Sequence, residues 1–554
     1  MSDPMALAAI GLTGMAVAVP LARRRLELSM AKHPSLAGHA RLARRLASLV
    51  PRYAYDEERF FASDGAPDEI VARRRHGFRQ LADRLATKHA RSVDLTREVR
   101  HALSDLQFTG AYRVPFPYAP YLREHITVGA FAESTDGMTM TDLDGRRFLD
   151  LTGSYGVNLF GHDFYKACIA EGAARVADLG VVLGSLHPSV SWNVERLRRI
   201  SGLDEVSFHM SGTEAVMQAV RLARYHTRRR KIVRFTGAYH GWWDDVQPGA
   251  GNPLPPRHTW TLREMDERTL RVLRSRGDIA CVLVNPLQAL HPNASPPADS
   301  ALVDSSRTAR VDRDAYATWL RAVRDACTAR GIVFILDDVF LGFRVAPGGA
   351  QEYFGVRADM VTYGKSLGGG LPVGVVCGRR DLMRRYREDR PAEICLARGT
   401  FNTHPYVMGA MQVFLERLES REIQGLYRDL DATWDGRAAQ LNAALEAAEL
   451  PARVANLSTI WTVSYTTPAR YNWMLQFYLR DAGLALPWVG TGRLIFPLTC
   501  TQDVFDEVAD AFVRAAEAMR GDGWWWHDSR TSNRSIRRHV LREMLRHRLR
   551  GSTA

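Results

Sequence analysis

Cysteine is scarce in this sequence of 554 residues. The chain has only six, at Cys168, Cys281, Cys327, Cys377, Cys395 and Cys500. None stands in a CxxC pair or at ligand spacing from histidine, which argues against a disulfide framework and against a metal site. Such usage fits a reducing compartment. Internal repeats and low-complexity tracts are also absent, and 46% apolar with 24% charged residues is typical of a globular protein.

Acidic residues are outnumbered, 61 against 74 Lys and Arg, which gives a net charge of +13. The excess lies at the two ends, in Arg23–Arg25, in Arg73–Arg75 and in the tail from Arg534 to Arg550. Such ends can contact anionic lipid, nucleic acid or solvent, and a solvated basic face is the commonest case. We expect no nucleic-acid partner. A chain this long is predicted to form two or three domains.

Charge is missing from Pro4 to Ala22, and Arg23–Arg25 follow directly. The stretch is about long enough to cross a bilayer, but it lacks the basic start and the cleavage site of a secretory signal. Residues 1–22 are therefore interpreted as a membrane anchor or as an apolar helix. We expect a cytoplasmic protein, attached to the inner membrane if this segment is an anchor.

Five further regions follow along the chain. Residues 23–105 predict a basic helical extension, in which Ile70, Val71, Phe78, Leu81 and Leu85 can share one face, as can Leu36, Ala37, Ala40, Leu42, Leu46 and Val50. Residues 106–165 predict the first part of a smaller domain, with a hairpin turning at Asp144-Gly145. Residues 166–405 predict the large domain, 406–522 the rest of the smaller α+β domain, and 523–554 a tail rich in Trp and Arg.

In the large domain, helical stretches alternate with short apolar strands. The strands are expected at 206–210, 231–235, 281–284, 333–336, 360–363 and 373–376, and in the smaller domain at 459–464 and 493–496. This alternation predicts an α/β fold with a mostly parallel sheet covered by helices on both faces.

The strongest chemical signal is an acid at the end of one strand and a lysine at the end of the next. Asp337 closes the apolar run from Ile332, and Lys365 follows 28 residues later between Gly364 and a run of three glycines. Ligands in open α/β sheets bind beyond the carboxyl ends of strands. A buried Asp there can keep a pyridinium nitrogen protonated, and a lysine with a lowered pKa can form an imine. Taken singly, Lys365 could be a surface turn residue, and Asp337 a helix cap or metal ligand.

Two upstream strand ends add to this pattern. Ser211, Gly212 and Thr213 open a helix and can bind a phosphate, although Ser-x-x-Glu sequences also cap ordinary helices. Tyr239 follows another strand and can stack on a flat ring or simply fill a loop. Each signal is weak by itself. Together they predict a site for pyridoxal phosphate.

With these residues in place, roughly residues 125 to 520 resemble the class III aminotransferases of fold type I pyridoxal phosphate enzymes, a family that includes glutamate-1-semialdehyde aminomutase. The matching segments are Ser211–Ala215, Tyr239–Gly241, Asp337–Val339, Gly342–Arg344, Gly349–Gly355, Gly364-Lys365, Gly368–Gly374 and Gly399–Pro405.

The resemblance implies a role for each matching residue. Lys365 would carry the cofactor as a Schiff base and move the substrate's proton, and Asp337 would pair with the pyridine nitrogen. Thr400 would reach the phosphate of a neighbouring subunit, which implies a homodimer with sites at the interface. The remaining cofactor-binding residues would be Ser211, Gly212, Thr213, Tyr239, His240 and Gln288, and the substrate would contact Arg493 and Tyr155.

Departures from the family pattern bear on the substrate. The usual Glu-Pro is Asn285-Pro286, and the glutamate that gates the carboxylate-binding arginine is replaced by Leu290. The segment Val114–Tyr118 lacks the arginine that the aminomutase uses. We therefore expect an aminotransferase that moves an amino group from an amino acid to an aldehyde or ketone, with a larger or more apolar acceptor.

Two other functions stay open at this point. One is intramolecular amino transfer of the aminomutase type, and the other is a catalytically silent, membrane-tethered binding module. The tail places Trp524–Trp526 before Ile536, Val540, Leu541, Met544, Leu545 and Leu549 at helical spacing, with Arg on the other face. That pattern fits an interfacial membrane helix, which would favour a lipid-like substrate, or a helix docked on its own protein.

Overall fold

The computed structural model describes residues 20–112, 114–247, 249, 251–252, 254, 256–294, 305–487 and 493–551. The apolar segment predicted over residues 1–22 therefore lies almost wholly outside the described residues. Within the described ranges, no helix is both long enough and apolar enough to cross a bilayer.

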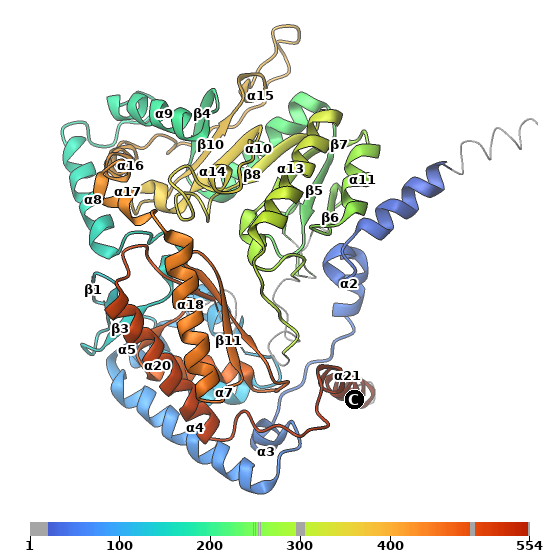
Figure 1. The fold of residues 1–554 in the computed structure, drawn as a ribbon, viewed down its shortest axis with the longest axis vertical. Coiled ribbons are helices and arrows are strands. Elements are labelled where there is room, and N and C mark those ends of the chain that lie inside the picture. The colour runs from blue at the N-terminus through green and yellow to red at the C-terminus, as the bar shows by residue number, and fades with distance from the viewer. Residues whose placement is uncertain are drawn as a thin grey trace, which may run out of the picture.

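A seven-stranded sheet forms the centre of the large domain (Figure 1). Its order is β4 (Glu205–His209), β10 (Gly374–Gly378), β9 (Met360–Gly364), β8 (Val333–Asp337), β7 (Ile279–Val284), β5 (Lys231–Phe235) and β6 (Thr259–Leu262). The pairs from β9 to β6 are parallel, whereas β10 runs antiparallel to both of its neighbours. Two parallel neighbouring strands need a long crossover connection between them. The connection from β9 to β10 is too short for a crossover, so these two strands pair antiparallel. The predicted mostly parallel sheet is confirmed.

Both faces of this sheet are buried, as expected of parallel strands. Alternate residues point to opposite sides: Leu283 and Ile335 pack with α10 (Gly212–Thr227), while Val284 and Leu336 join the cluster that contains α13 (Arg313–Arg330). The other helices of the large domain are α8 (His162–Arg175), α9 (Pro188–Ser201), α11 (Glu267–Ser275), α14 (Ala350–Phe354) and α15 (Arg380–Met383).

The smaller α+β part contains two short sheets. One joins β1 (Ser134–Asp136), β2 (Thr139–Thr141), β3 (Arg147–Asp150) and β13 (Leu484–Ala485), and the other joins β11 (Ala452–Leu457), β12 (Ile460–Tyr465) and β14 (Arg493–Ile495). Among the described residues, its helices are α17 (Arg421–Leu426), α18 (Leu430–Ala447), α19 (Leu475–Asp481) and α20 (Gln502–Gly521). The preceding helix α16 (Pro405–Leu418) packs on α8 and α9 of the large domain. The hairpin predicted at Asp144-Gly145 is present, with Thr141 opposite Arg147.

The first hundred described residues are helical. After a helix over residues 20–31 come α2 (Ala40–Ala47), α3 (Glu57–Ala62), α4 (Asp68–Lys88), α5 (Ala90–Val99), α6 (Ser104–Tyr112) and α7 (Ala119–His125). The predicted face of α4 is buried, from Ile70 to Leu85. In contrast, Leu42 and Leu46 of α2 are exposed, so this helix does not use these leucines to pack on the rest of the protein. Lys32 pairs with Leu262 and covers the β6 edge of the sheet.

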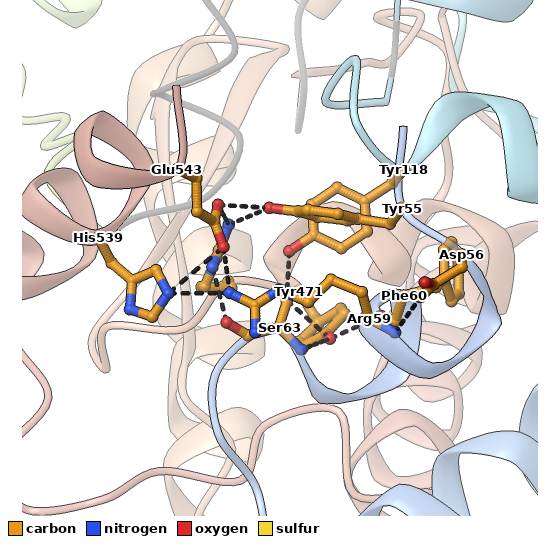
Figure 2. A network of polar contacts seen from close by, with 10 residues as sticks. Tyr55, Asp56, Arg59, Phe60, Ser63, Tyr118, Tyr471, His539 and Glu543 are labelled. Atoms are coloured by element: carbon orange, nitrogen blue, oxygen red, sulfur yellow. Dashed lines mark hydrogen bonds and ion pairs between the residues drawn. The ribbon is translucent and has the colours of Figure 1, made fainter. Parts of the chain in front are cut away.

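The tail folds back on the protein. Trp524 and Trp525 are buried, and their indole nitrogens donate to Tyr478 (2.7 Å) and Asn472 (3.0 Å). These tryptophans therefore belong to the protein core and do not form a membrane-facing belt. After them, α21 (Asn533–Gly551) docks beside α3 through the buried Glu543 (Figures 1 and 2).

Candidate active site

The predicted site residues converge on one edge of the large sheet. Ser211–Thr213 follow β4, Tyr239 and His240 follow β5, and Gln288 follows β7. Asp337 ends β8, and Lys365 directly follows β9. Parallel strands bring their carboxyl ends to the same side, so segments more than 150 residues apart in sequence meet here.

A buried carboxylate–imidazole pair lies at the centre of this edge. Asp337 Oδ2 is 2.7 Å from His240 Nδ1, and the Thr362 hydroxyl donates to Asp337 Oδ1 at 3.1 Å. Both Asp337 and His240 are buried, while His240 Nε2 has no hydrogen-bond partner among the described residues. These two contacts fix the orientation of the Asp337 carboxylate at the strand end.

Lys365 combines backbone strain with an altered amine. Its φ of 48° lies in the left-handed region, where a non-glycine residue is uncommon and often functional. Burial lowers the pKa of the Lys365 amine; the Asp337 carboxylate opposes this shift, while Arg344 and Arg493 add to it. An amine with a lowered pKa has a larger neutral fraction, which is the form that attacks a carbonyl.

Lys365 and Arg493 both lie near the ring of Phe340. Lys365 Nζ lies 5.3 Å from the ring centroid and the Arg493 guanidinium carbon 6.0 Å. A Cβ on Gly156 would stand 2.7 Å from the same ring, so the loop that carries Tyr155 crosses this position. Tyr155 is 46% exposed and has a φ of 57°. Arg493 and the loop that carries Tyr155, the two predicted substrate residues, therefore lie near Phe340, as Lys365 does.

The turn after β4 combines a capped helix start with backbone N–H groups that can bind a phosphate. Ser211 caps α10 by accepting from Glu214 N at 3.3 Å, and Glu214 in turn accepts from the backbone N–H of Met210, one residue before the cap, at 2.9 Å. The α10 N-terminus still points backbone N–H groups toward the site. A Cβ on Gly212 would stand 2.6 Å from Val339, so the glycine permits the start of α10 to approach the segment that follows β8.

Tyr239 is held at its backbone and open at its ring. Asn285 Nδ2 donates to the Tyr239 carbonyl at 2.9 Å, which gives the unusual asparagine of the Asn285-Pro286 pair a structural task. The Tyr239 side chain bonds to Thr213 and is 61% exposed, and burial together with Asp337 raises its pKa. Gln288 is buried and donates to the Thr236 carbonyl.

Residues 121–516 match the family described as aminotransferase class-III. The chain belongs to the class III aminotransferases. Curated relatives agree: the glutamate-1-semialdehyde 2,1-aminomutase of Geotalea daltonii is 32% identical over 367 residues, covering 62% of this chain and 78% of that protein. The protein of the same name from Methanococcus vannielii is 31% identical over 352 residues, covering 60% and 76%.

Solved structures of aminotransferase type share the fold. A transaminase with PLP bound superimposes with a TM-score of 0.60 at 27% identity, covering 71% of this chain and 92% of that chain. A glutamate-1-semialdehyde aminomutase from Pseudomonas aeruginosa gives a TM-score of 0.64 at 20% identity, covering 81% and 99%. The fold type I architecture is therefore confirmed.

Pyridoxal phosphate is the cofactor of this aminotransferase family, and the residues of the present site fit it. The buried acid Asp337 suits a protonated ring nitrogen, and the lowered pKa of Lys365 suits covalent attachment. Val339 lies against both Gly212 and Gly364, where added Cβ atoms would stand 2.6 and 3.2 Å away. The two glycines therefore leave no side chain of their own between these segments.

A second arginine, Arg307, adds positive charge near Arg493 in this aminotransferase. Burial, together with Arg307, lowers the pKa of Arg493 to about 10, and burial with both arginines lowers the pKa of His291 to about 3. Leu290, at the position of the usual gating glutamate, is fully buried. An anionic group is therefore favoured next to Arg493.

Several site residues were missed in the sequence. Thr362 stands opposite Asp337 in the β8–β9 register, so pairing the two predicted strands would have found it. Arg344 donates to Thr459 Oγ1 (2.9 Å) and to the carbonyls of Phe496 (2.8 Å) and Asn158 (3.1 Å), and so ties the large domain to the smaller one. Nothing local in the sequence reveals those distant acceptors.

Two further residues have other surroundings. Thr400 is exposed in the loop before α16. Asp338, the alternative acid, turns to the other side and accepts from Ala350 N at 2.8 Å. Burial raises its pKa to about 7.

Proposed function

We propose that this enzyme moves an amino group from an amino acid donor to an aldehyde or ketone, with Lys365 as the covalent attachment point of pyridoxal phosphate. The observation that carries the proposal is the convergence of Asp337, His240 and Lys365 at neighbouring strand ends, with one amine and one carboxylate oriented by buried contacts.

Each residue then has a chemical task. The bound cofactor supplies an electron sink for the bond broken at the substrate carbon that carries the amine. Asp337 holds the ring nitrogen protonated, and His240 and Thr362 keep Asp337 in place. Lys365 moves the proton from that carbon. Tyr239 covers the ring, while Ser211, Gly212, Thr213 and Gln288 hold the polar groups of the cofactor.

Substrate recognition is assigned to the Phe340 side. Arg493 binds the carboxylate of the donor, and Tyr155 lies over the entrance. Because Leu290 replaces the gating glutamate, nothing at that position withdraws the arginine when an acceptor without a carboxylate binds. We therefore infer that the acceptor also carries an anionic group or leaves Arg493 in contact with solvent.

Two variants test the assignment. Borohydride reduction followed by peptide mass measurement should place a pyridoxyl group on Lys365, and Lys365→Ala should lose the visible absorbance band of the attached cofactor. Asp337→Asn should keep bound cofactor but lower turnover by about 100-fold or more, because a preorganised charge is lost. Asp338→Asn is the matched control for folding. Near-normal turnover in Asp337→Asn would contradict the assigned acid.

Intramolecular amino transfer is the second candidate, and it is favoured by the names of the curated relatives. An aminotransferase converts a single amino acid donor to a free keto acid in the first half of its reaction, even without an acceptor. An aminomutase releases none. Stoichiometric keto acid formation with a panel of donors, followed by the change in cofactor absorbance, separates the two functions.

We also propose that the enzyme is a homodimer in which Thr400 of one subunit completes the phosphate site of the other. The exposure of Thr400 in the loop before α16 supports this arrangement.

A further inference from the structure

The C-terminal helix α21 has two unlike faces. Its inner face carries Ile536, Val540, Glu543, Met544 and His547, which are buried or half-buried against the enzyme. Tyr55 and Arg470 bond to Glu543 Oε2 at 2.6 and 3.3 Å, and Arg59 pairs with the other oxygen (Figure 2). The orientation of the helix on the protein is thereby fixed.

The outer face of α21 exposes leucines. Leu541, Leu545 and Leu549 are 58%, 59% and 71% exposed, and their spacing of four residues places them along one side of the helix. Exposed arginines flank them at Arg534, Arg538, Arg542, Arg546 and Arg548. The sequence pattern had suggested leucines on one side and arginines on the other, but the docked helix presents both outward.

The neighbouring helix α2 extends this surface. Arg548 Nη1 donates to the Leu49 carbonyl at 2.6 Å, so the end of α2 lies beside the last turns of α21. Leu42, Leu46, Leu49 and Val50 are 40–50% exposed, and Arg41, Arg44 and Arg45 stand between them. We call the outward residues of α2 through Val50 and of α21 the Leu–Arg face.

Acidic residues are missing from the Leu–Arg face. Residues 40–50 contain none, and residues 533–551 contain only Glu543, which is turned inward. A second copy of the chain docking here by twofold symmetry would bring arginine against arginine with no carboxylate to pair it. A nucleic acid would neutralise the arginines but leave the leucines in water.

We propose that the Leu–Arg face binds the surface of an anionic phospholipid bilayer. Lipid phosphates pair with the guanidinium groups, and the leucines enter the boundary between head groups and acyl chains. No membrane-spanning segment is needed, because the leucines and arginines that make the contact are exposed on the surface of the protein. The enzyme would then work at a membrane surface with its active site held above the lipid.

A cysteine-directed dye tests this contact directly. All six native cysteines are buried, so Leu545→Cys in the full chain can be labelled selectively with an environment-sensitive fluorophore. We expect a blue shift and co-sedimentation with phosphatidylglycerol-containing vesicles but not with phosphatidylcholine vesicles. Glu422→Cys, on the exposed side of α17, is the matched label position and should show no shift.

Two triple variants separate the contributions. Changing Arg538, Arg542 and Arg546 to Gln should weaken binding to anionic vesicles by about 100-fold. Changing Leu541, Leu545 and Leu549 to Gln should weaken it by at least about tenfold. Both should retain amino transfer in solution, since the helix lies outside the active site.

Several results would overturn the proposal. These are absence of vesicle binding, binding without a dye shift at position 545, and full binding by either triple variant. Self-association that buries the dye without lipid, or an equal dye shift with DNA, would identify another occupant of the face.

Discussion

At the scale of single residues, two adjacent carboxylates have different surroundings and therefore different tasks. Asp337 faces His240 and Thr362 at the sheet edge, whereas Asp338 accepts a backbone N–H from Ala350 on the opposite side of the chain. Because consecutive residues at a strand end point in opposite directions, only one of them can reach the ligand. Sequence composition alone does not distinguish them.

Arg493 should influence the pH at which the cofactor attaches. Burial is the main cause of the lowered pKa of Lys365, and the positive charge of Arg493 adds to it, so Arg493→Met should raise that pKa. The midpoint of cofactor attachment should then move to higher pH, by up to about one unit, because attack requires the neutral amine. The measurement is the absorbance change on adding pyridoxal phosphate to the apoenzyme across a pH series.

Arg493→Lys is the control for this shift, since it keeps the charge and should leave the midpoint near that of the wild type. A midpoint that moved to lower pH in Arg493→Met would mean that burial of the Lys365 amine, and not neighbouring charge, controls its protonation.

At the scale of secondary-structure elements, the large domain could be predicted because its signal is local. Apolar runs of four to six residues separated by helical periods fix β5, β7, β8 and β9 almost to the residue. The reversed direction of β10 follows from a short connection, which is also visible in the sequence. The strand β6 was missed because Thr259–Leu262 is short and carries only two strongly apolar residues.

The faces of α21 could not be predicted, because its leucines and arginines both fit helical spacing. Which face of α21 turns inward depends on Glu543, the only acidic residue of the helix, because it pairs with Arg59 and Arg470. These partners lie more than 70 residues away along the chain. For the same reason, local sequence patterns could not predict the contacts of Arg344 that join the two domains, because its acceptors are distant in the sequence.

The docking of α21 should depend on the charge of Glu543. Glu543→Gln would leave the buried Arg470 without its counter-charge, and we expect the free energy of unfolding to fall by about 3 kcal/mol. Hydrogen exchange should rise first in α21 and α3, because these elements share the network (Figure 2). Glu517→Gln, at an exposed position of α20, is the matched control and should change little.

The same carboxylate predicts a pH dependence. Burial favours its neutral form, but His539, Arg470, Tyr55 and Arg59 together hold the pKa of Glu543 well below its ordinary value. A carboxylate with a lowered pKa stabilises the fold above its unfolded pKa, about 4.3, and loses this effect as the pH falls. The difference between wild type and Glu543→Gln should therefore shrink below about pH 4. A constant difference would show that packing, not charge, holds the helix.

At the scale of the whole molecule, exposed apolar side chains mark a second surface besides the Leu–Arg face. Trp242, Ile394, Leu396 and Phe401 are between 48% and 74% exposed, and they lie close to Tyr239 or Thr400 in the sequence. Such residues are costly to leave in water. A second subunit packed on these residues would cover them and bring its Thr400 to the site.

Mixing two defective variants tests this arrangement. Thr400→Val should bind pyridoxal phosphate weakly and be inactive at limiting cofactor, and Lys365→Ala should be inactive at any concentration. If Thr400 acts across the interface, each mixed dimer has one site with both defects and one site with neither. An equal mixture after subunit exchange should then recover about a quarter of wild-type activity. If Thr400 served its own subunit, every site would keep one defect and no activity would return, although differently tagged copies still co-purified.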